Sequence, residues 1–138
     1  MTTENRLILQ SRLEELARVW PWLESLASRY KIPGKTQFAM NVCLEEALSN
    51  IIRHGYSNER PHSVTVEFAN PQTGYFIFIV EDQAPPFNPV DAPELSVLDS
   101  FGEVRMGGHG IRLLKGFADT LEYRRTPNGN QLRIGFTL

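Results

Sequence analysis

Residues 45–55 read EEALSNIIRHG, and the fold and function expected of the chain both depend on this stretch. It looks like the second half of an amphipathic helix running from about Thr36 to His54 and ending at a glycine. Glu46 and Asn50 are four residues apart, so they share one helix face. An Asn oxygen is a neutral ligand suited to Mg²⁺, and a Glu one turn away can accept a proton from an attacking hydroxyl. On this stretch alone, an ordinary surface polar pair is the preferred interpretation.

The composition is that of an ordinary soluble globular protein. A length of 138 residues suggests one domain with a real core, and 41% hydrophobic and 22% charged residues are typical values. The net charge of −2 argues against a dedicated nucleic-acid binder. No apolar run approaches a membrane span and the start lacks a signal-peptide pattern, so we expect a cytoplasmic protein without a membrane partner. The one cysteine, Cys43, excludes an intrachain disulfide and is expected to be a small buried hydrophobe.

Two elements are expected before this helix. Arg6–Gln10 is a short apolar run that predicts an edge strand. Ser11 and Glu14 have the spacing of a capping box, which predicts a helix start. Apolar residues then recur at helical spacing, and Pro21 falls inside that pattern, so a kink or break is expected there.

Two hairpins are expected after it. Ser63–Ala69 alternates apolar and polar residues, residues 70–74 predict a turn, and Tyr75–Val80 is apolar on both faces, as in a central strand. This strand delivers Asp82 at its C-terminal end. A short helix, Ile111–Phe117, precedes the closing hairpin. The closing hairpin comprises Asp119–Thr126 and Gln131–Leu138 around the turn 127–130, with Leu132, Ile134, Phe136 and Leu138 facing inward.

This order of elements predicts the fold class. Helices and an antiparallel or mixed sheet in separate layers give an α/β (α+β) two-layer sandwich. Between the hairpins, residues 83–108 break every pattern with four prolines and three glycines. Such a segment in a compact domain is functional, typically a lid, or else disordered. We place the lid at about residues 83–107.

Two further groups of residues can carry chemistry. The Asp82 carboxylate, at the end of a buried strand, can accept a hydrogen bond from an exocyclic amine such as adenine N6; a turn-forming Asp is the alternative. Residues 107–110, GGHG, open a helix, and backbone N–H groups at a helix start bind anions; a flexible hinge is the alternative. No Gly-Lys-Ser/Thr follows, so this is not a Walker loop.

Taken together, the motifs resemble those of the Bergerat-fold ATPases and kinases, which include gyrase, heat-shock chaperone, histidine kinase and mismatch-repair types. The three motifs, corresponding to the N box and the first and second glycine boxes, are Glu46-x-x-x-Asn50, Asp82-x-Ala84-x-Pro86 and Gly108-x-Gly110. The compact form of the chain is most similar to bacterial anti-sigma factor serine/threonine kinases of the RsbW type. The resemblance covers nearly the whole chain, residues 1–138, as one ATP-binding domain with a mainly antiparallel sheet covered by helices on one face.

The resemblance implies a role for each motif residue. Asn50 would hold Mg²⁺ between the phosphates of ATP, and Glu46 would be the general base for a substrate hydroxyl. Asp82 would accept a hydrogen bond from the adenine amine. Gly108 and Gly110 would give backbone donors to the phosphates.

Four more residues complete the expected nucleotide site. Ala84 and Pro86 belong to the first box, and Ala84 stands where the family has glycine, so its methyl could alter the approach of adenine or its water. The lid carries Arg105 and His109 and no lysine. Arg105 as a phosphate ligand is a hypothesis, and an exposed lid charge is its alternative.

The resemblance also implies partners. The substrate would be a STAS-domain anti-sigma factor antagonist phosphorylated on Ser or Thr, and in its other state the kinase would bind and silence a sigma factor, commonly as a homodimer. A nucleotide-dependent binding module without turnover remains open because of Ala84. A sensor histidine kinase catalytic domain would need a phospho-accepting histidine on a separate chain, since His54, His62 and His109 all lie within or beside the nucleotide-site elements.

Overall fold

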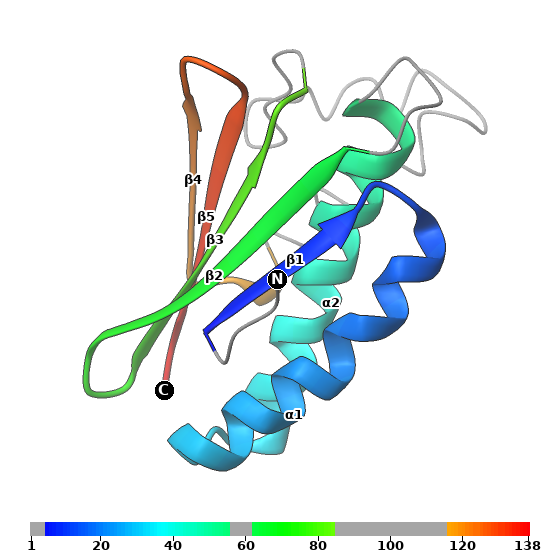
Figure 1. The fold of residues 1–138 in the computed structure, drawn as a ribbon. Helices are drawn as coiled ribbons and strands as arrows, with labels where there is room; N and C mark the ends of the chain where they lie inside the picture. Colours follow the sequence, from blue (N-terminus) through cyan, green and yellow to red (C-terminus); the bar gives the residue numbers. More distant parts are fainter. Residues whose placement is uncertain (1–4, 56–61, 85–115) are drawn as a thin grey trace, which may run out of the picture.

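The computed structural model describes residues 5–55, 62–84 and 116–138. These residues form an antiparallel five-stranded sheet in one layer and helices in a second layer that covers one face of the sheet (Figure 1). The strands are β1 (Arg6–Gln10), β2 (Ser63–Gln72), β3 (Tyr75–Asp82), β4 (Thr120–Arg125) and β5 (Asn130–Thr137). The helices are a 3₁₀ helix (Leu13–Arg18), α1 (Val19–Tyr30), α2 (Gly34–Asn50) and a π-helical turn (Ile51–Gly55). The predicted two-layer sandwich is confirmed.

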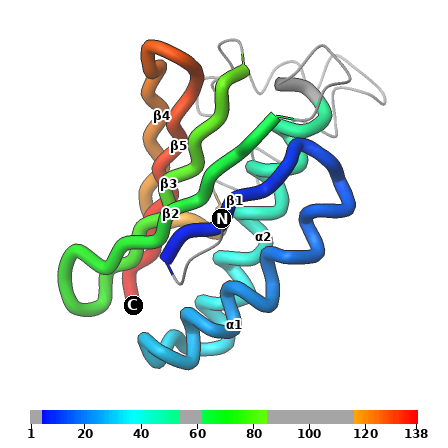
Figure 2. Tube along the Cα trace, viewed as in Figure 1, coloured from blue at the N-terminus to red at the C-terminus, as the bar shows by residue number. Residues whose placement is uncertain are grey.

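The sheet has the order β1-β2-β3-β5-β4, and each of its four pairings is antiparallel. The strand β3 is therefore central and β1 lies at an edge, as predicted. Because side chains alternate along a strand, Phe76, Phe78 and Val80 of β3 all face the helices and are buried. The same alternation turns Asp82, the last residue of β3, inward. Figure 2 shows α1 and α2 running side by side over this inner face.

The interior consists of side chains from both layers, chiefly Leu7, Leu9, Leu23, Leu26, Met40, Leu44, Leu48, Phe78, Ile134 and Phe136. Cys43 of α2 is among the fully buried residues, as predicted. Burial raises the pKa of the Cys43 thiol to about 12, so this side chain stays a neutral hydrophobe.

The capping box predicted at Ser11 and Glu14 is not formed. The Ser11 hydroxyl instead accepts a hydrogen bond from the backbone N–H of His62, at 2.8 Å. It is Glu15 whose carboxylate accepts from a backbone donor, the N–H of Gln10, at 3.0 Å. The chain enters a 3₁₀ turn here with no side-chain cap, because the serine is used to tie the end of β1 to the residue before β2.

The break predicted at Pro21 falls earlier. The helix changes from 3₁₀ to α geometry between Arg18 and Val19, which leaves Pro21 as the third residue of α1. A helix has no intrahelical partner for its first N–H groups, so proline is tolerated in the first turn.

The second helix extends over the predicted range, but its geometry changes at the end. Regular α2 ends at Asn50, and the chain continues as a π-helical turn through Gly55. Such turns are uncommon and occur often at functional sites. In the described part of the chain, no helix is long and apolar enough to cross a membrane.

The closing hairpin differs from the prediction at both ends of β5. Asn130, expected in the turn, is the first residue of the strand and pairs with Asp82. The turn is instead closed by the N–H of Thr126, which donates to the carbonyl of Gly129 at 2.9 Å. Leu138 was expected to face inward, but it follows the strand and is 55% exposed. Of the predicted helix before this hairpin, residues 116 and 117 are described and are helical.

Candidate functional site

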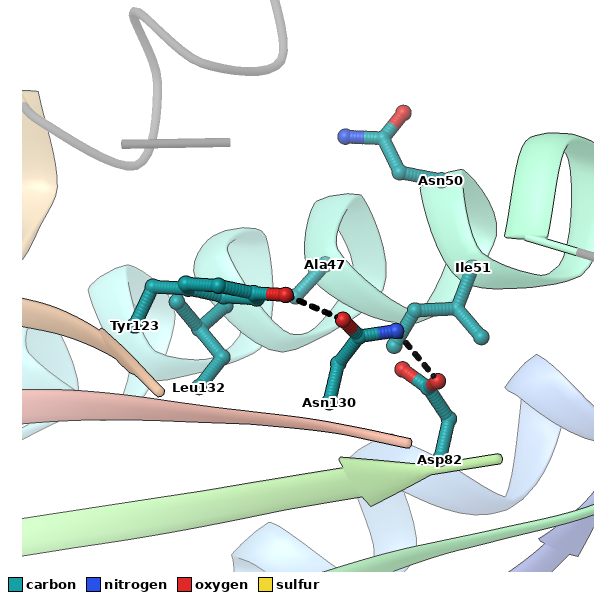
Figure 3. A pocket seen from close by; sticks show the side chains of 7 residues that line it. All are labelled: Ala47, Asn50, Ile51, Asp82, Tyr123, Asn130 and Leu132. Atoms are coloured by element: carbon teal, nitrogen blue, oxygen red, sulfur yellow. Dashed lines mark hydrogen bonds between the residues drawn. The ribbon is translucent and has the colours of Figure 1, made fainter. Parts of the chain in front are cut away.

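A small cavity lies where the end of α2 meets the C-terminal end of β3. Its volume is about 20 Å³, room for about one water molecule. The lining residues come from α2, the π-helical turn and strands β3, β4 and β5, and they are Ala47, Asn50, Ile51, Asp82, Tyr123, Asn130 and Leu132 (Figure 3). Two residues predicted to bind one nucleotide, Asn50 and Asp82, thus line the same cavity although 32 positions separate them in the sequence.

Asp82 places a buried carboxylate at the end of the central strand. Its Oδ1 atom accepts two hydrogen bonds, from the backbone N–H of Ala84 at 2.8 Å and from the Nδ2 group of Asn130 at 2.9 Å. Burial raises the pKa of Asp82, while the donors of Asn130 and Ala84 and the charge of Arg125 act in the opposite direction. The site therefore holds a desolvated carboxylate with one oxygen engaged by the protein.

The β4–β5 hairpin holds this carboxylate in place. Asn130 donates to Asp82 and, at 3.2 Å, to the carbonyl of Ala84. Its own oxygen accepts from the Tyr123 hydroxyl and, at 3.4 Å, from Nη1 of Arg125. Arg125 also donates to the Ala84 carbonyl at 2.8 Å. The carbonyl of Ala84, two residues after β3, is thereby bound to two side chains of the hairpin.

Asn50 approaches the cavity from the opposite layer. It is the last residue of regular α2 and is buried, with 6% of its surface exposed. In Figure 3 its amide lies on the helix side of the cavity, apart from the hydrogen-bonded pair of Asp82 and Asn130. The amide of Asn50 and the carboxyl group of Asp82 therefore lie at separate positions around one space.

Glu46 lies one helical turn before Asn50 and is half-buried. It is not among the residues that line the cavity. Its carbonyl oxygen accepts a hydrogen bond from the Ser49 hydroxyl at 3.2 Å. The neighbouring Glu45 is exposed, as the helix geometry requires for a residue about 100° around the axis.

Asn50 offers one oxygen ligand of a kind that Mg²⁺ accepts. Within residues 5–55, 62–84 and 116–138, no three His, Cys, Asp or Glu side chains gather in a way that could hold a metal ion. If Mg²⁺ bound at Asn50, phosphate oxygens and water would supply its other ligands, as is common beside nucleotides.

The remaining predicted site residues lie outside the described residues. They are Pro86, Arg105, Gly108, His109 and Gly110, together with the lid beyond Ala84. Their predicted roles stay predictions. Ala84 itself is buried, and both its N–H and its carbonyl are used in the network around Asp82.

Sequence reasoning missed three residues of the site, namely Tyr123, Arg125 and Asn130. Asn130 was assigned to a turn because Asn and Gly beside Pro are typical turn residues. Its place beside Asp82 follows only from the pairing of β5 with β3, which no local sequence pattern indicates. Tyr123 and Arg125 are two residues apart on β4, so their side chains lie on the same face of the sheet.

Two comparisons of the sequence find similar proteins. A family model described as histidine kinase-like ATPase domain matches residues 9–136. The serine/threonine-protein kinase BtrW of Bordetella bronchiseptica is 27% identical over 113 residues, which is 82% of this chain and 79% of that protein.

Solved structures share the fold. The histidine kinase domain of the Erythrobacter litoralis EL346 blue-light activated histidine kinase has a TM-score of 0.51 at 20% identity, over 87% of this chain and 61% of that one. A second structure of that blue-light activated kinase has a TM-score of 0.58 at 19% identity, over 91% of this chain. The chain spans 41% of that second structure's length.

Proposed function

The chain belongs to the histidine kinase-like ATPase domain family, and from this premise we propose that it is a protein serine/threonine kinase that uses Mg²⁺–ATP. Its substrate is a Ser or Thr of a STAS-domain anti-sigma factor antagonist. In its other state the protein binds and silences a sigma factor, as a homodimer in the cytoplasm. The similarity to a protein named as a serine/threonine kinase supports the choice of reaction.

The observation that carries the proposal is the shared cavity of Asn50 and Asp82. The two side chains come from different layers, and both are buried polar groups. Burying polar groups is costly unless they have partners. Oδ1 of Asp82 already has partners. The cavity itself has room for about one water molecule, so an adenine nucleotide would lie beside it, with its base amine at Oδ2 of Asp82 and its phosphate-bound metal at Asn50.

Phosphoryl transfer needs positioning and charge neutralisation more than covalent chemistry. When bound, Mg²⁺ neutralises phosphate charge, and Asn50 is the residue of this chain that would hold it. Glu46, one turn away on the same helix face, would accept the proton of the substrate hydroxyl. Gly108 and Gly110 would donate backbone N–H groups to the phosphates, with Arg105 and His109 nearby on the lid. Pro86, the last residue of the same motif as Asp82, would lie near the adenine base.

The experiment combines the protein with Mg²⁺, ATP and a STAS-domain protein encoded beside it, and measures phosphate on the STAS protein by intact mass spectrometry. We expect one phosphate on a Ser or Thr, and none when Mg²⁺ is chelated. A protein that binds ATP but leaves its STAS partner unmodified would rule out the kinase reaction.

A second function is an ATP-dependent binding module without turnover. The observation that favours it is the position of Glu46, which does not line the cavity with Asn50 and Asp82. The presence of Ala84 in place of a glycine also favours this second function. ATP-dependent binding to a sigma factor, unchanged by Glu46→Ala and without phosphate transfer, would establish this function in place of the kinase.

A further inference from the structure

We propose that Asn130 is a specificity-determining residue that restricts Asp82 to adenine by engaging one of its two carboxylate oxygens. Asn130 acts through Asp82, so it is a positioning residue. The inference rests on the proposed function, since it requires Asp82 to face the nucleotide base.

The first step is the occupancy of Oδ1 on Asp82. A carboxylate oxygen has about two lone-pair positions. On Oδ1 these are used by the N–H of Ala84, at 2.8 Å, and the Nδ2 group of Asn130, at 2.9 Å. Both bonds are short and involve an ionisable acceptor, which makes them strong hydrogen bonds. The second oxygen, Oδ2, is the one left to meet a ligand.

The second step is the fixed orientation of the Asn130 amide. Its nitrogen faces two acceptors, Asp82 Oδ1 and the Ala84 carbonyl. Its oxygen faces two donors, the Tyr123 hydroxyl and Nη1 of Arg125. Turning the amide over would place an oxygen against a carboxylate and an NH₂ group against a guanidinium. Asn130 is 4% exposed, so these contacts are largely shielded from bulk solvent.

The third step is the difference between the two purine bases. Adenine offers a single exocyclic amine, N6, to an acceptor, and one carboxylate oxygen is enough to bind it. Guanine offers N1–H and the 2-amino group side by side, a pair of parallel donors that matches both oxygens of one carboxylate, as the fork of arginine does. With Oδ1 already engaged, Asp82 keeps the contact that adenine needs and loses half of the contact that guanine needs.

The test is the ratio of ATP to GTP affinity, measured by isothermal titration calorimetry in the presence of Mg²⁺. The informative pair of variants is Asn130→Val and Asn130→Thr, because the two side chains have the same shape and only threonine carries a hydroxyl donor. We expect the valine variant to lose about tenfold of the ATP preference, the worth of a hydrogen bond to a charged group. The threonine variant should keep more of the preference. Asn128→Ala, an exposed position in the adjoining turn, should match the wild type.

The outcomes separate the two proposals. A wild-type protein without affinity for ATP would overturn the proposed function. Wild-type binding of ATP with the same ATP-to-GTP ratio in the valine variant would overturn the role of Asn130 alone, since a merely structural residue would weaken both nucleotides in parallel. Thermal melting establishes that each variant is folded, and Asn130→Ala replaces the valine variant if that variant does not fold.

Discussion

At the scale of single residues, the site is organised around one buried carboxylate whose ionisation the fold disfavours. Burial raises the pKa of Asp82 even though two hydrogen-bond donors and Arg125 favour its charged form. A residue kept at a cost to stability is typical of a functional position. The trade-off between stability and binding can be tested directly.

Asp82→Asn should stabilise the protein while abolishing nucleotide binding. Below the ordinary carboxyl pKa of 3.8, Asp82 is protonated in both the folded and the unfolded state. As the pH rises through the higher pKa of the folded state, ionisation lowers the stability of the wild type but not of the variant. The melting temperature of the variant relative to the wild type should therefore increase from about pH 3.8 upward. A difference that is constant with pH would contradict the assigned burial.

Substitutions of Asn50 and Glu46 on α2 should separate nucleotide binding from phosphate transfer. Asn50→Ala should remove the Mg²⁺-dependent part of ATP affinity, because it deletes the proposed metal ligand. Glu46→Ala should leave ATP affinity in place and lower the rate of phosphate transfer by roughly 10²-fold, as expected for loss of a general base. Glu45→Ala is the matched control, since that residue is exposed. Calorimetry gives the affinities and single-turnover assays give the rates; unchanged transfer in Glu46→Ala would remove this residue from the base role.

The residues of the candidate site differed in how far the sequence alone could predict them. Asn50 and Asp82 could be proposed from the sequence because one lies on a helix face, the other at a strand end, and the motifs around them resemble those of one family. Asn130 could not, because its function comes from pairing with a strand 48 residues earlier, which no local pattern encodes. The shift of one residue between turn and strand decides whether its side chain reaches Asp82.

At the scale of elements, the turn between β4 and β5 is fitted against the end of β3. A Cβ atom added to Gly129 would lie 1.7 Å from the backbone oxygen of Asp82 and 2.7 Å from Cα of Gln83. Both are backbone atoms and cannot rotate away. The glycine is thus needed for the close approach that lets Asn130 bond to Asp82.

Gly129→Ala should destabilise the protein by about 1–3 kcal/mol, the usual cost of overpacking, and should weaken ATP binding by moving the hairpin away from Asp82. Gly34→Ala is the control, because a Cβ there meets nothing within 4 Å. That variant should be neutral or slightly stabilised, by up to about 1 kcal/mol. Urea unfolding and calorimetry measure the two effects, and equal behaviour of the two variants would show that the close contact is unimportant.

The elements that the sequence misassigned are those shaped by tertiary contacts. Ser11 and Glu14 had the spacing of a capping box, but the serine bonds to His62, 51 residues away. Pro21 was expected to break a helix and instead lies in its first turn, because the 3₁₀ segment before it moved the helix start. A contact distant in sequence thus replaces the cap at Ser11, and the preceding 3₁₀ segment decides where Pro21 falls in its helix.

At the scale of the whole molecule, one aromatic side chain joins the sheet to the helices. Phe78, at the middle of β3, has its ring centroid 5.9 Å from Trp22 of α1, 5.3 Å from Phe68 of β2 and 6.1 Å from Phe136 of β5. It is fully buried. The alternation that places Phe78 inside also places Ile79 on the opposite face of the sheet.

Phe78→Ala should cost about 3–5 kcal/mol of stability, because it removes a large ring from a packed interior and leaves a cavity. Ile79→Ala, at the next position, should cost clearly less, since this side chain is only half-buried. The free energies of unfolding in urea provide the comparison. Similar losses for the two variants would mean that the inner face of β3 is not the centre of the core.

The layered architecture itself was readable from the sequence. Helical spacing around residues 45–55 and a strand that alternates apolar and polar residues predict helices packed against one face of a sheet. Strand order came out as expected for β1 and β3 because an edge strand and a central strand differ in composition.

The most direct measurement is a crystal structure of the protein with Mg²⁺ and a non-hydrolysable ATP analogue. The adenine amine should lie within hydrogen-bonding distance of Oδ2 of Asp82, with Oδ1 still bonded to Asn130, and the metal should be coordinated by the Asn50 oxygen and by phosphate oxygens. A nucleotide bound elsewhere, or a base that makes no contact with Asp82, would contradict the assignment of Asp82 and Asn50 to the adenine nucleotide site.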